Sequence, residues 1–573
     1  MIFACNLLLV ARMAMFFVVL KNLCLAISYS VNKTLKIFDR FPLWLLVFFC
    51  FLAYGNSLGN SFSYDDEFTI TKNAFIQHPE KRSALFSRDY FSISGEESFR
   101  PIVTLTQIFN YAMNGLHPFG YHLFNIALHL CNGILLYSCV FLISGSKRQS
   151  LAIALLFLLF PVNTEAVNAI SFREDLLVTF FGLFGFQLFL TSLNDSGQRY
   201  LGWSAAFTFL AMLSKENGLV LPFLFLGYDL FFQGKPSSEV FWKRYSPFLF
   251  CLFGFIFFRF ILFTNPLAKP LPFLGGSFLA AVSLVPYAFC SSLRLWIFPY
   301  PLSADYPAID SQPIAWTIMA ITGALFLGSV WLIFFLRKRD PIAGFGFFWI
   351  LLCFLPTSNL VPLMQTFAER YLYLPGIGFL VVLVRGLRHC LPIRLLKIVL
   401  GSLAILYLGL TIHRNADWQN NSALWETTLR QNPTSLRALN NLGIERLREG
   451  NIQESLRLLD QAVQLGANAD IFGNRGKAHL AANNLPAALA DLNRAIELQE
   501  KKPAFWQNRG IVHGLLGQFD ASIADFNRLI ELSPDDPEAF RNRGITFQSM
   551  GKNLEAARDF QKARDLQNSR NQS

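Results

Sequence analysis

Charged residues are scarce in this 573-residue chain: Asp, Glu, Lys and Arg make up 15% of it, against about 25% in ordinary soluble domains. Hydrophobic residues make up 53%, and phenylalanine alone occupies 61 positions. The scarcity is uneven, because about 12% of residues 1–412 are charged, against about 24% of residues 413–573. These proportions exclude a soluble protein of several domains and predict a polytopic membrane domain in the first part.

Cysteine is also sparse where a soluble fold would use it. The nine cysteines all lie in or beside apolar segments, with none in residues 55–121 and none after Cys390. No CxxC pair is present, so a disulfide framework and a cysteine zinc site are both excluded. The chain also lacks a glycine-rich nucleotide-binding loop and any histidine–carboxylate spacing typical of a metalloprotease.

Basic residues give the chain a formal net charge of +11, and nearly all of this excess lies between the apolar runs of residues 1–412. A nucleic-acid-binding protein gathers such charges on one soluble face, so we expect no nucleic-acid partner. Basic loops in alternate positions follow the positive-inside rule of membrane proteins. This rule places residues 56–121, residues 357–370 and everything after residue 412 on the outward side.

Eleven segments approach the length of about 20 apolar residues that a bilayer core requires. They lie near residues 41–55, 122–143, 150–168, 175–193, 201–213, 219–233, 246–264, 313–336, 342–358, 371–386 and 395–412. Residues 276–297 are apolar too, but counting them as a span would export Arg337–Arg339, so we expect a re-entrant or interfacial segment there. Residues 2–29 are interrupted by Arg12 and Lys21, which leaves an extra helix, an interfacial helix and an upstream start site as alternatives.

A repeat of about 34 residues organises the end of the chain. Gly443, Gly476, Gly510 and Gly544 are spaced by 33, 34 and 34 residues, and a small residue follows each of them twelve positions later. This period is the signature of tetratricopeptide repeats, whose small residues let paired helices pack closely. We therefore divide the chain into an N-terminal segment (1–40), a membrane domain (41–412) and a repeat domain (413–573). The repeats favour protein docking, with structural packing on the membrane domain as the alternative.

Two adjacent acids, Asp65 and Asp66, follow the first predicted span in the segment FSYDDEFTITKN. Neighbouring carboxylates repel each other, which raises the proton affinity of one of them. Such a pair suits a general base or a divalent-cation site. A solvated turn or a helix N-cap is the alternative, because aspartate favours both.

Further charged and polar residues collect near the ends of spans on the predicted outward side. Ionisable residues at membrane depth are candidates for function, although local neutralisation of neighbouring charges is the alternative. The candidates for substrate binding are Arg100, His117, Arg173, Glu174, Lys215, Glu216, Glu369, Arg370 and Tyr371. If Arg173, Lys215 and Arg370 meet at one level, they form a site for a lipid-linked phosphate.

The order of these segments resembles one family. FSYDDEFTITKN, SFRPIVTLTQIFNYAMNGLHPFGYHLFNIALH, SFREDLLVTFFGLFGF, LSKENGLVLPFLFLGYDLF and ERYLYLP, followed by the repeats, are similar to the transmembrane and tetratricopeptide-repeat O-mannosyltransferases. These belong to the GT-C class of integral membrane glycosyltransferases. The resemblance covers nearly the whole chain from about residue 41. It implies an all-α fold of about eleven spans with a large outward first loop, followed by a tetratricopeptide α-solenoid.

The resemblance also implies a reaction. Such enzymes transfer a sugar, typically mannose, with inversion from a polyprenyl- or dolichyl-phosphate carrier to Ser/Thr hydroxyls of proteins on the periplasmic or lumenal side. Asp65 and Asp66 then correspond to the acidic pair, one of them acting as the base. Arg173, Lys215 and Arg370 correspond to the residues near the donor phosphate. No cofactor is firmly implied, and a divalent cation at Asp65/Asp66 stays an alternative.

Two other functions fit parts of the sequence. A transferase with the same donor could act on a cell-envelope glycan or lipid instead of a protein. A non-enzymatic membrane-anchored repeat scaffold is the third hypothesis, but an anchor needs a single span and leaves the outward charges unexplained. Both a bacterial inner membrane with periplasmic repeats and an endoplasmic reticulum with lumenal repeats agree with the sequence.

Overall fold

The structure is a computed structural model that describes residues 40–87, 89–94, 96, 98–193, 199–263, 265, 271–307, 316–466 and 468–572. The apolar segment 2–29, with its three alternatives, lies outside the described residues. Within the described ranges all regular structure is helical, which confirms the predicted all-α fold.

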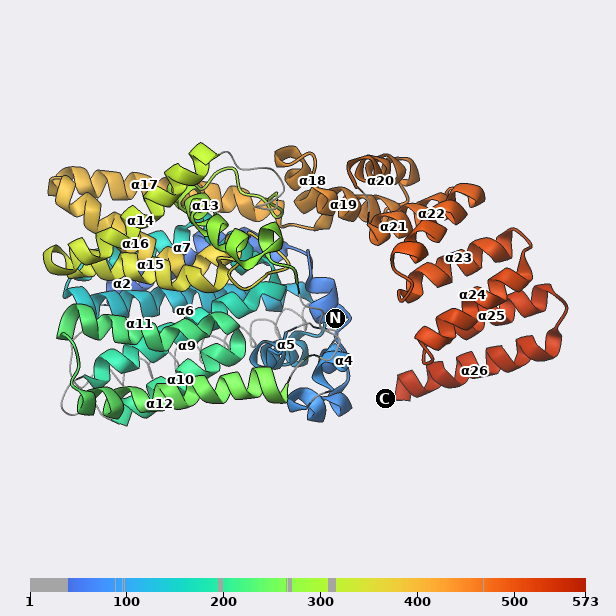
Figure 1. Cartoon of the computed structure of the whole chain (residues 1–573), viewed down its shortest axis with the longest axis horizontal. Helices are drawn as coiled ribbons and strands as arrows, with labels where there is room; N and C mark the ends of the chain where they lie inside the picture. The colour runs from blue at the N-terminus through green and yellow to red at the C-terminus, as the bar shows by residue number, and fades with distance from the viewer. Residues whose placement is uncertain are drawn as a thin grey trace, which may run out of the picture.

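The apolar helices form an elongated bundle, and the repeats extend from one of its ends (Figure 1). The long apolar helices run along the bundle axis. Helices suit an apolar surrounding because each satisfies its backbone polar groups within its own segment. The bundle consists of α2 (Arg40–Tyr54), α6 (Pro118–Ser144), α7 (Lys147–Leu159), α8 (Thr164–Asn168), α9 (Arg173–Ser192), α10 (Arg199–Ser214), α11 (Leu221–Tyr228), α12 (Ser238–Phe257), α13 (Phe278–Ile297), α14 (Trp316–Arg339), α15 (Pro341–Phe354), α16 (Tyr373–Cys390) and α17 (Ile393–Asp417). The loop after α2 adds three short helices, α3 (Ala74–Gln77), α4 (Tyr90–Ser94) and α5 (Pro101–Asn114).

Eight helices of the described residues are long and apolar enough to cross a membrane, and the bent pair α7–α8 would make a ninth. The chain is therefore a multi-pass membrane protein. Helix α2 reaches this length together with the 3-10 turn that follows it, as Phe41–Gly59. Three of the eleven predicted spans are not among these helices: they correspond to α10 with 16 residues, α11 with 8 and α15 with 14. The number of crossing helices stays a prediction.

Helix α13, which we expected to be re-entrant or interfacial, is continuous over 20 residues and is long and apolar enough to cross a membrane. The residues on either side of it nevertheless lie at the same end of the bundle. Phe263, before the helix, packs against Phe99 of the first loop with ring centroids 4.5 Å apart. Tyr306, after it, hydrogen-bonds Glu369 beside the repeats. Because both flanking segments lie at one end of the bundle, the re-entrant or interfacial position of α13 stays a prediction.

The repeat domain forms a curved array of helix pairs beyond the end of α17 (Figure 1). Its helices are α18 (Asn421–Gln431), α19 (Leu436–Arg448), α20 (Ile452–Gly466), α21 (Ala469–Ala481), α22 (Leu485–Leu498), α23 (Pro503–Leu515), α24 (Phe519–Leu532), α25 (Pro537–Ser549) and α26 (Asn553–Gln572). The predicted glycines lie where paired helices touch. A Cβ atom at Gly510, for example, would meet the Phe526 ring at 2.9 Å.

Two glycines of α23 provide a matched test of this packing. Gly510→Ala is expected to destabilise the α23–α24 pair by about 1–3 kcal/mol, because the added methyl group overpacks the contact. Gly514→Ala, one turn later, places its Cβ at an ordinary 3.4 Å from Ser522 Oγ, so the better helix propensity of alanine stabilises by about 1 kcal/mol. Hydrogen exchange of α23 and α24 in the full chain measures both changes. Equal effects of the two substitutions would contradict the packing account.

Candidate active site

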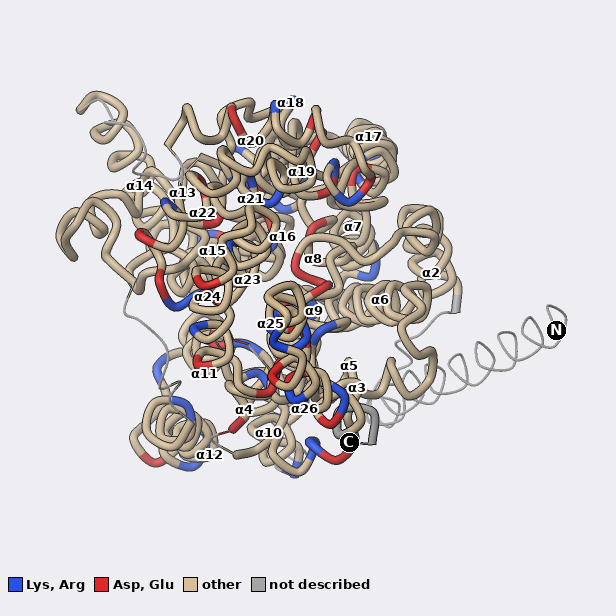
Figure 2. Tube along the Cα trace, turned by 90° about the vertical axis from the view of Figure 1, so that its right-hand side faces the viewer, with Lys and Arg blue, Asp and Glu red and all other residues tan. Residues whose placement is uncertain are grey.

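The charged candidates meet at the end of the bundle that faces the repeats. The loop after α2, the turn between α8 and α9, the residues after α10 and the start of α16 all reach this end. Figure 2 views the molecule from this side, with repeat helices in front of α8, α9 and α16.

The two adjacent acids have different environments. Asp66 is completely buried, and its two carboxylate oxygens accept the backbone N–H groups of Ser171 at 2.6 Å and Ser63 at 3.1 Å. Burial raises the pKa of Asp66 to about 6, although these hydrogen bonds oppose the shift. Asp66 therefore connects the loop after α2 to the turn between α8 and α9 through hydrogen bonds.

Asp65 is the acid that reaches solvent. Its side chain is exposed, and no described residue forms a hydrogen bond or ion pair with its carboxylate. The surrounding protein still desolvates it enough to raise its pKa, while Arg370 and Arg437 partly counteract that rise. An accessible carboxylate with a raised pKa and no bound partner is available to accept a proton.

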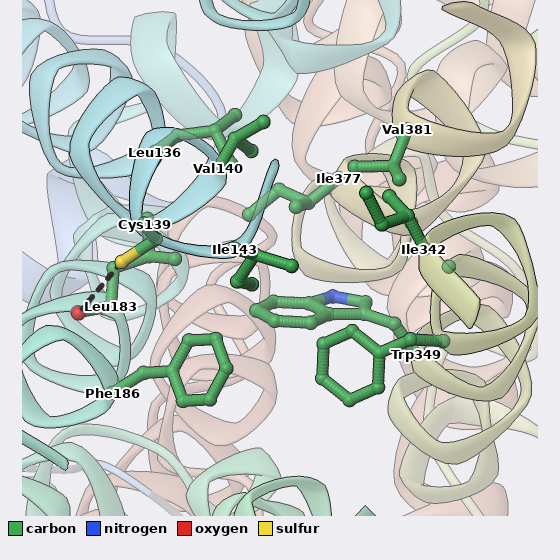
Figure 3. Close-up of a pocket in the computed structure, with 13 residues that line it drawn as sticks. Leu136, Cys139, Val140, Ile143, Leu183, Phe186, Ile342, Trp349, Ile377 and Val381 are labelled. Carbon is green, nitrogen blue, oxygen red and sulfur yellow. Dashed lines mark hydrogen bonds between the residues drawn. The ribbon is translucent and has the colours of Figure 1, made fainter. Parts of the chain in front are cut away.

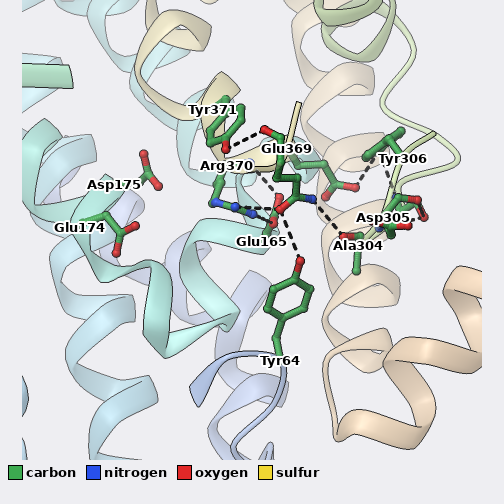
Figure 4. A network of polar contacts seen from close by, with 12 residues as sticks. Tyr64, Glu165, Glu174, Asp175, Ala304, Asp305, Tyr306, Glu369, Arg370 and Tyr371 are labelled. Atoms are coloured by element: carbon green, nitrogen blue, oxygen red, sulfur yellow. Dashed lines mark hydrogen bonds and ion pairs between the residues drawn. The ribbon is translucent and has the colours of Figure 1, made fainter. Parts of the chain in front are cut away.

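Arg370 lies in the short helix Glu369–Leu372 just before α16 (Figure 4), and its charge favours the ionised form of Asp65. Its guanidinium contacts Glu165 at 2.5 Å and Gln365 at 2.8 Å, and its backbone N–H donates to the second Glu165 oxygen at 2.8 Å. The guanidinium also stacks over the Phe172 ring, 3.8 Å from its centroid. Glu165 is almost completely buried, so this pair holds a desolvated charge on each side.

A second charge cluster lies next to the first. Lys215 contacts Asp175 at 2.5 Å and Glu174 at 3.8 Å, and Glu174 also pairs with Arg100 at 2.8 Å. The Tyr371 ring joins the two clusters, because the Lys215 ammonium lies 5.7 Å and the Arg370 guanidinium 5.0 Å from its centroid. Figure 4 shows the Glu174 and Asp175 carboxylates on the side of α9 that faces Arg370.

Glu216 extends this cluster toward the end of α12. It forms longer contacts of 3.4 Å with Arg100 and with Arg259, a residue just beyond α12. Burial favours the neutral form of Glu216, but the two arginines outweigh it and lower its pKa. Arg100 and Arg259 keep 25% and 17% of their side chains exposed, more than the 7% of Lys215. They are therefore the more accessible cations.

Arg173 does not join these clusters, although we expected it near a donor phosphate. Its guanidinium is completely buried and donates to Asn125 at 2.7 Å, Thr106 at 3.2 Å and the Tyr121 carbonyl at 3.3 Å. Consecutive residues of a helix point about 100° apart, so Arg173 faces α5 and α6 while Glu174 faces the clusters. Arg173 thus packs the helices together in this structure.

Two other predicted residues, Glu369 and His117, lie outside the two charge clusters. Glu369 is completely buried and accepts hydrogen bonds from Tyr306 at 2.8 Å and Arg414 at 3.3 Å, which connects the start of α16 to α17. His117 is exposed immediately before α6, and its ring has no hydrogen bond or ion pair with any described residue. The charge clusters form without it.

Glu165 and Arg259 were not among the predicted residues, although each stands out in the sequence. Glu165 is the acid near the end of the predicted span 150–168, and Arg259 is a lone cation in FIFFRFILF. An ionisable residue within an apolar run is itself a signal of function or of a buried partner. Gln365 carries no such signal, because an amide in a polar loop is ordinary.

The described residues do not favour a divalent cation at Asp65/Asp66. Both oxygens of Asp66 already accept backbone N–H groups, and no three His, Cys, Asp or Glu side chains of the described part are placed to hold a metal ion. The apolar cavity between α6, α9, α15 and α16 has a volume of about 30 Å³ (Figure 3). It has room for one small group and lacks charged lining residues, so it does not suit a sugar phosphate.

The comparisons with known proteins agree with this architecture. A family described as "Tetratricopeptide repeat" matches residues 440–504, and one described as "TPR repeat" matches residues 515–551. The human protein O-mannosyl-transferase TMTC3 is 26% identical over 493 residues, which cover 78% of this chain and 53% of that protein. This chain is similar to the protein O-mannosyl-transferases.

Other protein O-mannosyl-transferases match to the same degree. The mouse protein TMTC4 is 28% identical over 488 residues, covering 72% of this chain and 65% of its own length. This coverage exceeds what the repeats occupy, so the similarity to the O-mannosyl-transferases includes membrane helices. The chain spans about half to two thirds of the length of these relatives. Among solved structures, MamA is 22% identical with a TM-score of 0.26, covering 28% of this chain and 92% of its own.

Proposed function

We propose that this chain is an inverting membrane glycosyltransferase that moves mannose from a polyprenyl- or dolichyl-phosphate carrier to Ser/Thr hydroxyls of proteins. The single observation that carries the proposal is Asp65, an exposed carboxylate without a partner among the described residues, set beside two clusters of buried charges at one end of a membrane bundle. The similarity to protein O-mannosyl-transferases supports the choice of sugar and acceptor.

In this proposal the acceptor hydroxyl gives its proton to the Asp65 carboxylate. The hydroxyl oxygen forms a bond to the anomeric carbon of the mannose, and the bond from that carbon to the carrier phosphate breaks. The lipid phosphate leaves with the bonding electron pair, so the anomeric configuration inverts. A base on one side and cations around the leaving phosphate on the other are what this displacement requires.

In the proposal, the cations of the site stabilise the leaving phosphate in two ways. Lys215 and Arg370 are held close to acids, so they supply fixed positive charges near the reacting centre. Arg100 and Arg259 keep part of their side chains exposed, which suits direct contact with a phosphate. Arg259 follows α12, and Phe257 and Phe260 on either side of it are exposed on the surface of the bundle, so a polyprenyl chain has an apolar surface beside it.

The site end of the bundle faces the lumen or periplasm in the proposal. The support is the distribution of basic residues, several of which gather at the other end around Asp340 and Gln149. Arg385 and His389 contact Asp340 at 3.0 and 2.7 Å, and Arg388 donates to Gln149 at 3.1 Å. The positive-inside rule assigns such an end to the cytoplasm.

The pH dependence of transfer tests the assigned base. Because Asp65 must be ionised to accept a proton, kcat/KM is expected to fall as the pH is lowered through its pKa. That pKa is raised, so the acid limb lies above the ordinary aspartate value of about 3.9. Measuring kcat/KM for mannose transfer to a Ser/Thr peptide between about pH 4 and 8 locates the limb. A profile that stays flat down to pH 4 would remove Asp65 as the base.

A further inference from the structure

The first repeat shares one hydrophobic core with the turn between α8 and α9, and Tyr64 of the loop after α2 packs against it. Trp418, Trp425 and Leu439 of the repeat side pack with Ala169 and Phe172 of the membrane domain in a single buried cluster. The packing continues into polar contacts, since the Ser61 N–H donates to the Gln419 carbonyl at 2.9 Å. The Ser435 hydroxyl donates to Asp305 at 2.7 Å. The repeat domain thus joins the candidate site directly.

Tyr64, the residue before Asp65, is the centre of this junction. Its φ of 59° is in the left-handed region, which is costly for a residue with a bulky side chain and persists only when neighbours impose it. The imposing contacts come from the repeat side. Asn421 accepts its backbone N–H at 2.8 Å, and the Trp425 ring lies 5.3 Å from its ring centroid.

Arg437, in α19 of the first repeat, completes the constraint on Tyr64. Its guanidinium donates to the Tyr64 hydroxyl at 2.6 Å and lies 3.7 Å from the Asp305 carboxylate. The Tyr64 hydroxyl in turn donates to Gln365 at 3.4 Å, and Gln365 also accepts from Arg370. A continuous chain of contacts therefore runs from the repeat array through Tyr64 to the charges of the membrane domain. Figure 4 shows its membrane-domain part, from Tyr64 to Arg370.

We propose that Arg437 is a positioning residue of the active site, which fixes Tyr64 and thereby aims Asp65, so that the first repeat is part of the catalytic centre. This inference rests on the proposed function for its kinetic consequence. Its structural part, the ordering of the loop 61–71 by α19, holds independently of the reaction.

The charges around Asp65 give the inference a pH signature. Arg370 from the start of α16 and Arg437 from α19 favour its ionised form, while Glu174 of α9 and Glu165 of α8 oppose it. Arg437→Gln removes one of the two favourable charges, so the acid limb of the kcat/KM profile moves to higher pH. Arg437→Lys keeps the charge and loses the fork geometry, so the limb stays near its wild-type place.

The experiment compares the full chain in lipid nanodiscs as wild type, Arg437→Gln, Arg437→Lys and Arg509→Gln. Arg509 is the control, because it pairs with Asp525 at 2.7 Å inside the array and does not contact the loop. The two readouts are hydrogen exchange of residues 61–71 and the pH profile of mannose transfer from polyprenyl-phosphate mannose to a Ser/Thr peptide. The first readout needs no activity.

The expected result is loop exchange about tenfold faster in Arg437→Gln, the effect of losing one hydrogen bond from a charged donor. In the same variant the acid limb of the pH profile moves to higher pH. Arg509→Gln changes neither readout. Wild-type loop exchange in Arg437→Gln overturns the inference, and so does equal loosening of the loop by Arg509→Gln. An active wild type with an unshifted limb in Arg437→Gln overturns the kinetic part. A wild type without transfer overturns the proposed function instead, and loop exchange still decides the positioning role.

Discussion

Asp65→Asn is expected to lower kcat for mannose transfer by about 10²–10⁴-fold, the range that a general base contributes. Asparagine keeps the shape of the side chain but cannot take the acceptor proton. Because the Asp65 carboxylate has no hydrogen bond or ion pair with a described residue, thermal stability is expected to stay unchanged. Transfer by purified protein and its unfolding temperature are the two measurements.

Asp66→Asn and Asp89→Asn serve as controls for this prediction. Asp66→Asn turns an acceptor of two backbone N–H groups into an acceptor of one, so it loses about 1–3 kcal/mol of stability together with activity. Asp89→Asn changes an exposed acid of the same loop and leaves both properties intact. Full activity in Asp65→Asn would refute the assigned base, and full activity in both Asp65→Asn and Asp66→Asn would refute the proposed chemistry of this loop.

Arg370→Gln is expected to destabilise the protein by about 3–5 kcal/mol, because it leaves the Glu165 carboxylate buried without its cation. Transfer is expected to fall by about 10²-fold or more, since a fixed positive charge is lost near the leaving phosphate. Denaturant unfolding in detergent and transfer at saturating donor measure the two effects.

The double substitution Arg370→Gln/Glu165→Gln separates these effects. Replacing both charges removes the unpaired carboxylate, so most of the lost stability returns. Transfer stays low, because the positive charge is still absent. If the double variant regains transfer along with stability, Arg370 is only structural and its assigned role near the phosphate is wrong.

The repeats and the membrane domain could be predicted because their signals are local. Glycines such as Gly476 and Gly510 recur at a fixed period, and apolar runs of sufficient length report a bilayer directly. The span count was less certain because buried helices such as α15 need not reach full length. Protein neighbours cover their ends, and sequence does not reveal those neighbours.

The site could be predicted only in outline. The pair Asp65–Asp66 is visible in the sequence, but the division of roles depends on the backbone N–H of Ser171, a residue 105 positions away from Asp66. The burial of Arg173 depends on the direction of its side chain from α9. Arg437 could not have been singled out, because an arginine on a repeat helix is ordinary until the fold brings it to Tyr64.

The most direct test of the account is transfer of labelled mannose by the purified wild-type chain in nanodiscs, from polyprenyl-phosphate mannose to a library of Ser/Thr peptides. The account predicts label on peptide hydroxyls, with an anomeric configuration opposite to that of the donor. Label that stays on the lipid, moves only to a glycan or lipid acceptor, or reaches the peptides with retained configuration would contradict it.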